Sequence, residues 1–219
     1  MANKDETDFM LEEYKQIAKA FSDLYIQMNN ILKLYLTLIS IGSTAIVTIL
    51  TVGSNLFSET TTIFGLLSIE QLAGTSFFVL AIVGMTILAS MIGTRIEMLR
   101  YARTINCIRG YFANKHTEIK NYLVLPTYDD KTPPFFESLN RPFIWQVIML
   151  SSLNSILIIV SVNVYFSIPQ INFIGNVFFV ALIFIGQMFM YYGICWSREK
   201  EYIAKIEKPK QQENKDAAK

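Results

Sequence analysis

The stretch KLYLTLISIGSTAIVTILT, from Lys33 to Thr51, is apolar enough to lie in lipid, yet a hydroxyl group returns at every helical turn. Successive hydroxyl residues are three or four positions apart, so in a helix they share one face. These residues are Thr37, Ser40, Thr44, Thr48 and Thr51. Such a face is suited either to pack against other helices in a bundle or to line a water-filled pore, and the sequence leaves both interpretations open.

Long segments without any charged residue or histidine determine the predicted fold class. They are Leu34–Ser58, Gln71–Thr94 and Pro142–Ser197. A membrane-spanning helix needs about 20 apolar residues, so the first two segments hold one span each and the third holds two, separated near Pro169. We therefore predict an all-α integral membrane protein rather than a soluble helical core. The four transmembrane helices are expected at about residues 34–55, 74–95, 143–166 and 173–196.

The distribution of basic residues predicts which parts of the chain lie on each side of the membrane. All 19 Lys and Arg residues lie in residues 1–33, 95–141 and 198–219, and the connections 53–73 and 167–172 hold none. The positive-inside rule then places both termini and the central loop in the cytoplasm. The predicted location is a bacterial inner membrane, crossed several times, with membrane lipid as one partner.

The predicted cytoplasmic parts follow from heptad spacing. One apolar seam precedes the first span, and a shorter one follows the second span. Their residues are Met10, Tyr14, Ile17, Phe21, Leu24, Met28 and Ile31, and then Met98, Tyr101, Ile105, Ile108 and Phe112. Each span is thus expected to continue inward as an amphipathic helix. The first seam suits either a coiled coil between copies or packing on the second helix of the same chain.

Four arginines follow the second span and form a candidate surface for anionic lipid or a protein partner. They are Arg95, Arg100, Arg103 and Arg109. Attraction to an anionic membrane surface contributes about 1 kcal/mol per basic residue. The domain organisation is then a cytoplasmic amphipathic helix (1–33), a four-helix transmembrane domain (34–196) with a cytoplasmic loop (96–141), and a disordered cytoplasmic tail (197–219).

The sequence contains no strong catalytic motif. No Gly-rich phosphate loop, G-x-S-x-G or H-E-x-x-H pattern occurs. Arg109 and His116 resemble the Arg/His pair of HEPN ribonucleases in spacing alone, and Asp129 with Asp130 lacks further ligand groups for a metal. We therefore expect no enzyme activity, no cofactor, no metal site and no direct nucleic acid binding.

The layout resembles a known kind of protein. The segments MLEEYKQIAKAF, LKLYLTLIS and RIEMLRYARTINCIRGYF are similar to parts of small polytopic membrane proteins of prokaryotic antiviral defence systems, such as Kiwa KwaA-like subunits and retron-type membrane effectors. The resemblance implies a membrane sensor or a membrane-disrupting effector that works with a cytoplasmic protein encoded nearby. A homo-oligomer is also expected, because the heptad-patterned N-terminal helix offers a means of assembly. The alternatives are a channel or small-molecule transporter, and a structural membrane anchor for a soluble enzyme.

Overall fold

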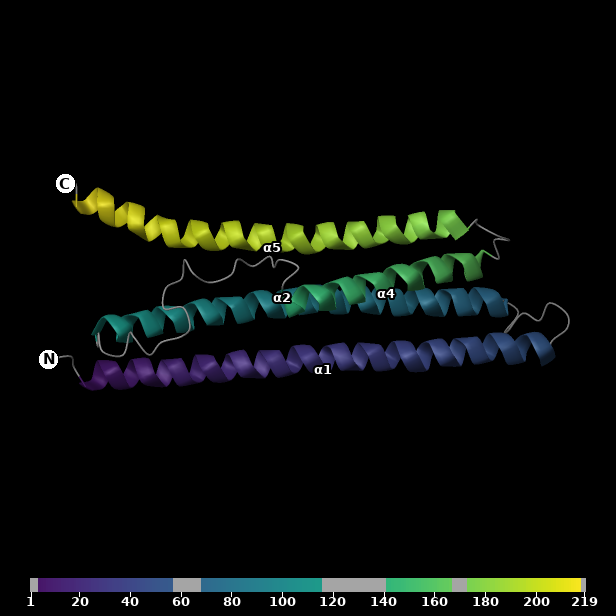
Figure 1. Ribbon diagram of the computed structural model, residues 1–219, viewed down its shortest axis with the longest axis horizontal. Helices are drawn as coiled ribbons and strands as arrows, with labels where there is room; N and C mark the ends of the chain where they lie inside the picture. The colour runs from purple at the N-terminus through teal and green to yellow at the C-terminus, as the bar shows by residue number, and fades with distance from the viewer. Residues whose placement is uncertain (1–3, 57–67, 116–140, 167–172, 218–219) are drawn as a thin grey trace. The chain divides into compact units, whose positions relative to one another are not determined.

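The computed structural model describes residues 4–56, 68–115, 141–166 and 173–217, and Figure 1 draws the helices that they form. The helices are α1 (Lys4–Leu56), α2 (Ile69–Lys115), α4 (Pro142–Tyr165) and α5 (Phe173–Ala217). Within these ranges the chain forms no strand. The predicted all-α fold class is confirmed.

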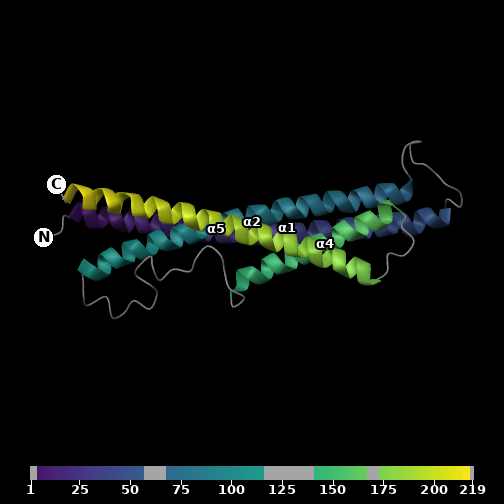
Figure 2. The same cartoon turned by 90° about the horizontal axis from the view of Figure 1, so that it is seen from above.

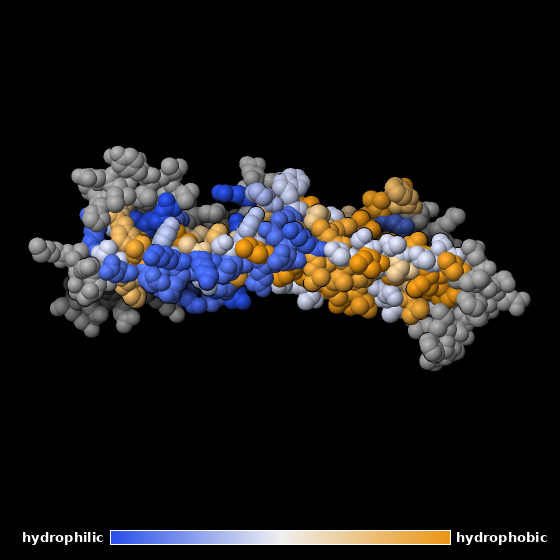
Figure 3. All heavy atoms as spheres, turned by 90° about the horizontal axis from the view of Figure 1, so that it is seen from below, coloured by the Kyte–Doolittle hydropathy of each residue, from blue (hydrophilic) through white to orange (hydrophobic). Residues whose placement is uncertain are grey.

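Each helix contains a segment that is long and apolar enough to cross a membrane. These segments lie within Thr7–Val52, Ile69–Lys115, Pro142–Tyr165 and Phe173–Lys205. Large apolar side chains are exposed along them, for example Ile41 and Phe178, and hydrophobic residues gather over one stretch of the surface drawn in Figure 3. A broad apolar exterior is what lipid requires, so the fold is that of a multi-pass membrane protein.

The described residues separate into two compact units. The polar unit contains residues 4–29, 92–115 and 192–217, and the apolar unit contains residues 30–56, 68–91, 141–166 and 173–191. α1, α2 and α5 contribute residues to both units, whereas α4 belongs to the apolar unit alone. Figure 2 shows the same helices from above.

Local sequence explains where two of the helices begin. At the start of α2, Ser68 and Gln71 form a capping box, in which each backbone N–H donates to the other residue's side-chain oxygen at 3.1 Å. At the start of α4, Pro142 occupies the first turn, where a missing N–H costs nothing. These signals start both helices at their apolar segments.

The heptad seams of the polar unit face the interior of the chain. Ile17 and Met28 of α1 are buried, as are Met98 and Ile108 of α2. The other seam residues are intermediate in exposure. Lys115 of α2 also donates a hydrogen bond to the Thr7 hydroxyl at 3.1 Å. Both predicted helical extensions are confirmed, and the seam residues are covered within one chain, which favours intrachain packing over a coiled coil between copies.

The C-terminal tail differs from its prediction. We expected disorder from residue 197, but α5 continues as a helix to Ala217. Glu201 provides a physical reason, because it forms ion pairs one turn before and one turn after itself, with Arg198 and Lys205 at 3.0 Å each. Its hydrogen bond from Lys205 is the largest of the influences that lower its pKa. Pairs at this spacing stabilise an exposed helix.

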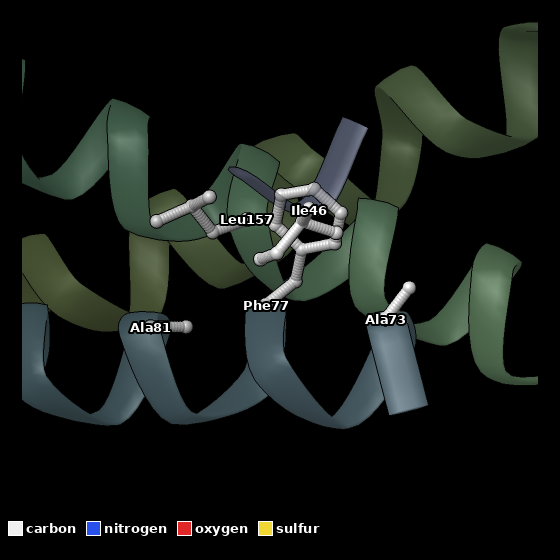
Figure 4. Close-up of a cluster of buried hydrophobic side chains, with 5 residues drawn as sticks. All are labelled: Ile46, Ala73, Phe77, Ala81 and Leu157. Atoms are coloured by element: carbon white, nitrogen blue, oxygen red, sulfur yellow. The ribbon is translucent and has the colours of Figure 1, made fainter. Parts of the chain in front are cut away.

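A small apolar cluster lies inside the apolar unit. Figure 4 shows Phe77 of α2, Leu157 of α4 and Ile46 of α1, which belong to this cluster. Ala73 and Ala81 lie one turn to either side of Phe77, and their small side chains let the neighbouring helices approach closely. Ser161 of α4 adds a hydrogen bond to the Gly74 carbonyl oxygen at 2.7 Å. Three helices are therefore joined at this level.

Candidate functional site: an exposed hydroxyl face and a buried polar network

The five hydroxyl residues of α1 all lie on the exposed surface of the apolar unit. We call this surface the hydroxyl face: Thr37, Ser40, Thr44, Thr48 and Thr51. The opposite side of the same helix carries the buried residues Tyr35 and Ile46. No neighbouring helix of the described chain therefore covers the hydroxyl face. Among the residues that the structure describes, none packs on it, and packing between copies or contact with water remains open.

The hydroxyls of this face bond to their own helix. The Thr44 hydroxyl donates to the Ser40 carbonyl oxygen and the Thr48 hydroxyl to the Thr44 carbonyl oxygen, both at 2.8 Å. Thr37 and Thr51 make the equivalent bonds at 2.9 and 3.0 Å. The O–H donors of the four threonines are thus satisfied locally, as Thr and Ser often are inside helices, and their oxygen lone pairs remain available on the outer surface.

A second polar site lies inside the same unit. The Tyr35 hydroxyl of α1 donates to Asn154 Oδ1 of α4. Asn154 Nδ2 in turn donates to Gln187 Oε1 of α5 at 3.4 Å, and Gln187 Nε2 donates to Ser155 Oγ at 3.3 Å. Ser155 donates to the Ser151 carbonyl oxygen at 2.7 Å. We call these residues the polar network, and all five are buried.

Gly84 of α2 lies directly against the polar network. A Cβ atom at this position would fall well inside contact distance of Asn154 Oδ1 and of the Tyr35 hydroxyl. Only a glycine leaves room for that pair to meet against the helix backbone. The network therefore depends on all four helices, with α2 contributing space rather than a side chain.

The polar network has no group suited to acid–base or nucleophilic chemistry near neutral pH, because its members are amides, aliphatic hydroxyls and one phenol. Its hydrogen bonds instead hold the helices in place. In lipid, polar side chains seek partners across helices, and each such bond contributes about 0.6–2 kcal/mol. The polar network thus fixes how α1, α4 and α5 are arranged in the apolar unit.

α5 depends most on the polar network for its attachment. Only 6% of the most apolar stretch of α5 is buried, compared with 39% of the corresponding stretch of α4. Within the apolar unit its buried residues are Gln187 and Tyr191, and Tyr191 lies 6.3 Å from Phe143 between ring centroids. Asn176 adds a bond from Asn163 Nδ2 at 3.1 Å. Polar bonds therefore carry much of the attachment of α5.

We expect Gln187→Leu to weaken the attachment of α5 by about 1–4 kcal/mol, because it removes two interhelical bonds and leaves Asn154 and Ser155 short of a partner. Thermal unfolding of the purified protein in detergent measures this loss. Gln146→Leu is the matched control, because Gln146 Oε1 is buried without a partner among the described residues. Equal unfolding temperatures for the Gln187 variant and the unmodified protein would contradict the positioning role.

Arg103 does not belong to the predicted arginine surface. It is 4% exposed, and its Nη2 donates to both carboxylate oxygens of Glu199 at 2.9 and 3.1 Å. Its guanidinium also lies 4.4 Å from the centre of the Tyr202 ring. The sequence prediction for this residue was wrong, because the acceptor lies on α5, far away in the sequence. Arg103 instead joins α2 to α5 inside the polar unit.

The other three arginines keep partly exposed positions. Arg95, Arg100 and Arg109 are intermediate in exposure, and Arg100 forms an ion pair with Glu97 at 3.3 Å. These residues remain a candidate surface for anionic lipid or a protein. Trp196 and Lys200 of α5 add a cation–π contact of 3.5 Å near the end of an apolar segment, a combination typical of a membrane interface.

Several predicted features lie outside the described residues, namely His116, Asp129 and Asp130. In the described ranges, no group of three or more His, Cys, Asp or Glu side chains is placed to hold a metal ion. The candidate site therefore consists of the hydroxyl face and the polar network.

The fold and these two features define a class: an all-helical, multi-pass membrane protein with four candidate spans. Comparisons with protein-family models, with curated proteins and with solved structures found no match to this chain.

Proposed function

We propose that this chain is a non-enzymatic protein of the bacterial inner membrane that acts in antiviral defence by permeabilising the membrane. The observation that carries the proposal is the hydroxyl face, which lies on the exposed surface of a membrane segment rather than inside the chain. The outer oxygen lone pairs of this face gain hydrogen-bond partners when water or another copy of the chain contacts it. Several copies that turn this face inward would enclose a path lined by hydroxyl groups.

The polar unit supplies the surface for a second protein. It carries most of the charged residues, including the partly exposed Arg95, Arg100 and Arg109. A cytoplasmic protein encoded nearby is the proposed partner, and its arrival is proposed to increase the assembly or opening that the chain reaches alone. The same features suit the alternative in which the chain senses infection and the partner does the damage.

The proposed location rests on the charge distribution. Lys and Arg are absent from the two connections assigned to the outside, and this bias orients membrane proteins with their basic loops in the cytoplasm. Four crossings also place both ends of a chain on the same side. The role in defence rests on the resemblance of residues 10–40 and 95–112 to membrane proteins of that kind.

The first test is the permeability of the inner membrane in bacteria that express the chain, before and after phage challenge, measured by potassium loss and dye entry. Leakage is the expected result. An intact membrane in every condition would overturn the proposal and favour an anchor or sensor.

A pair of substitutions tests whether the hydroxyl face is responsible. Thr44→Leu combined with Thr48→Leu is expected to abolish leakage while the protein still accumulates in the membrane, because leucine removes the polar lining. Thr86→Leu is the matched control, since Thr86 of α2 is also exposed and also bonds to its own helix, at 3.0 Å to the Ile82 carbonyl oxygen. Leakage that persists in the double variant would show that the path lies elsewhere.

A further inference from the structure

Lys33 lies on the same line of α1 as the hydroxyl face. It precedes Thr37 by four residues, which is one helical turn, and its carbonyl oxygen accepts the Thr37 hydroxyl at 2.9 Å. The Lys33 side chain is exposed. A surface that runs from Lys33 to Thr51 therefore begins with a cation and continues with neutral hydroxyls.

The charge of Lys33 is not balanced by a nearby acid on α1. The sequence contains no Asp or Glu from Leu24 to Ser58, and Lys33 is the one charged residue in that stretch. Among the described residues, the ion pairs formed by lysines involve Lys15 and Lys205, and Lys33 takes part in none. A full positive charge thus remains at one end of the hydroxyl face.

The hydroxyls themselves give little preference between ions of opposite sign. They are neutral, and most of their donors are used by the carbonyl oxygens of their own helix. A full charge acts over a longer range than such a dipole, and rings of Lys or Arg side chains favour anions in pores. In an assembly of copies, one lysine from each chain would form such a ring at the mouth.

We propose that the path lined by the hydroxyl face is selective for small inorganic anions, such as chloride, and that Lys33 determines this selectivity. The inference rests on the proposed function, because it requires that the hydroxyl face line a path. It adds the class of permeant ion and names the residue that chooses it.

The test is the reversal potential of the purified full-length protein in planar bilayers with a potassium chloride gradient. The unmodified protein is expected to reverse toward the chloride equilibrium potential. Lys33→Glu should move the reversal potential to the potassium side, Lys33→Gln should bring it near zero, and Lys33→Arg should leave it unchanged. Replacing chloride with gluconate on one side should reduce the current through the unmodified protein, which tests anion passage without any variant.

Arg141→Glu is the matched control. Arg141 is exposed, lies at the start of the apolar segment of α4 and undergoes the same change of charge. Its reversal potential should stay on the chloride side, and an equal shift in both variants would overturn the role of Lys33. Current without anion preference would overturn this inference while leaving the pore intact. No current from the unmodified protein, under any voltage, would overturn the proposed function and the inference together.

Discussion

Gly84→Ala is expected to cause a large loss of stability, of about 3 kcal/mol or more. The added methyl group would overlap the Tyr35 hydroxyl and Asn154 Oδ1, so their bond must break or the helices must separate. Overpacking costs about 1–3 kcal/mol, and a buried polar group without its partner costs a further 1–3 kcal/mol or so. Thermal unfolding in detergent, with the fraction of monodisperse protein, measures the effect.

Gly93→Ala is the control for helix propensity. Gly93 lies on the same helix, and nothing lies within 4 Å of a Cβ built at that position. Alanine there should be neutral or stabilising by up to about 1 kcal/mol, because glycine is the poorer helix former. If the Gly84 and Gly93 variants unfolded alike, the close approach of α2 to the polar network would be refuted.

Arg103→Ala is expected to destabilise the polar unit by up to about 3–5 kcal/mol, because it removes the buried guanidinium that pairs with the largely buried Glu199 carboxylate. Arg100→Ala, which removes the exposed pair with Glu97, should cost less than about 1 kcal/mol. Limited proteolysis of the protein in detergent compares the two variants, since an opened polar unit exposes cleavable backbone.

Removing both members of the buried pair separates loss of charge from loss of packing. Arg103→Met with Glu199→Met should recover most of the stability, because neither charge is then stranded in the interior. Equal protease sensitivity in the single and double variants would mean that contacts such as the Tyr202 ring, rather than the ion pair, hold this site together.

The sequence predicted the features that depend on local pattern. Charge-free segments located the apolar parts of all four helices, and heptad spacing predicted that α1 and α2 continue beyond them. Periodicity also placed Thr37 to Thr51 on one face. It did not reveal which way that face points, because direction depends on where the other helices pack.

Features that depend on distant residues escaped prediction. Tyr35 gave no signal, since an aromatic residue at the start of an apolar segment is ordinary, and its role arises from Asn154 of another helix. Asn154 and Gln187 are amides within apolar segments, but local sequence does not say which groups they pair with. Arg103 looked like its neighbours because an ion pair with Glu199 leaves no trace in local spacing.

The bonds between the α1 threonines and their own helix bear on how the chain is made. A newly synthesised segment passes into the bilayer before its future neighbours are present, and unsatisfied donors oppose that step. The hydroxyl hydrogens of these threonines are already occupied by backbone carbonyl oxygens of α1. Each copy can therefore be inserted into lipid and remain there as a monomer. Synthesis of the chain does not by itself require that copies assemble.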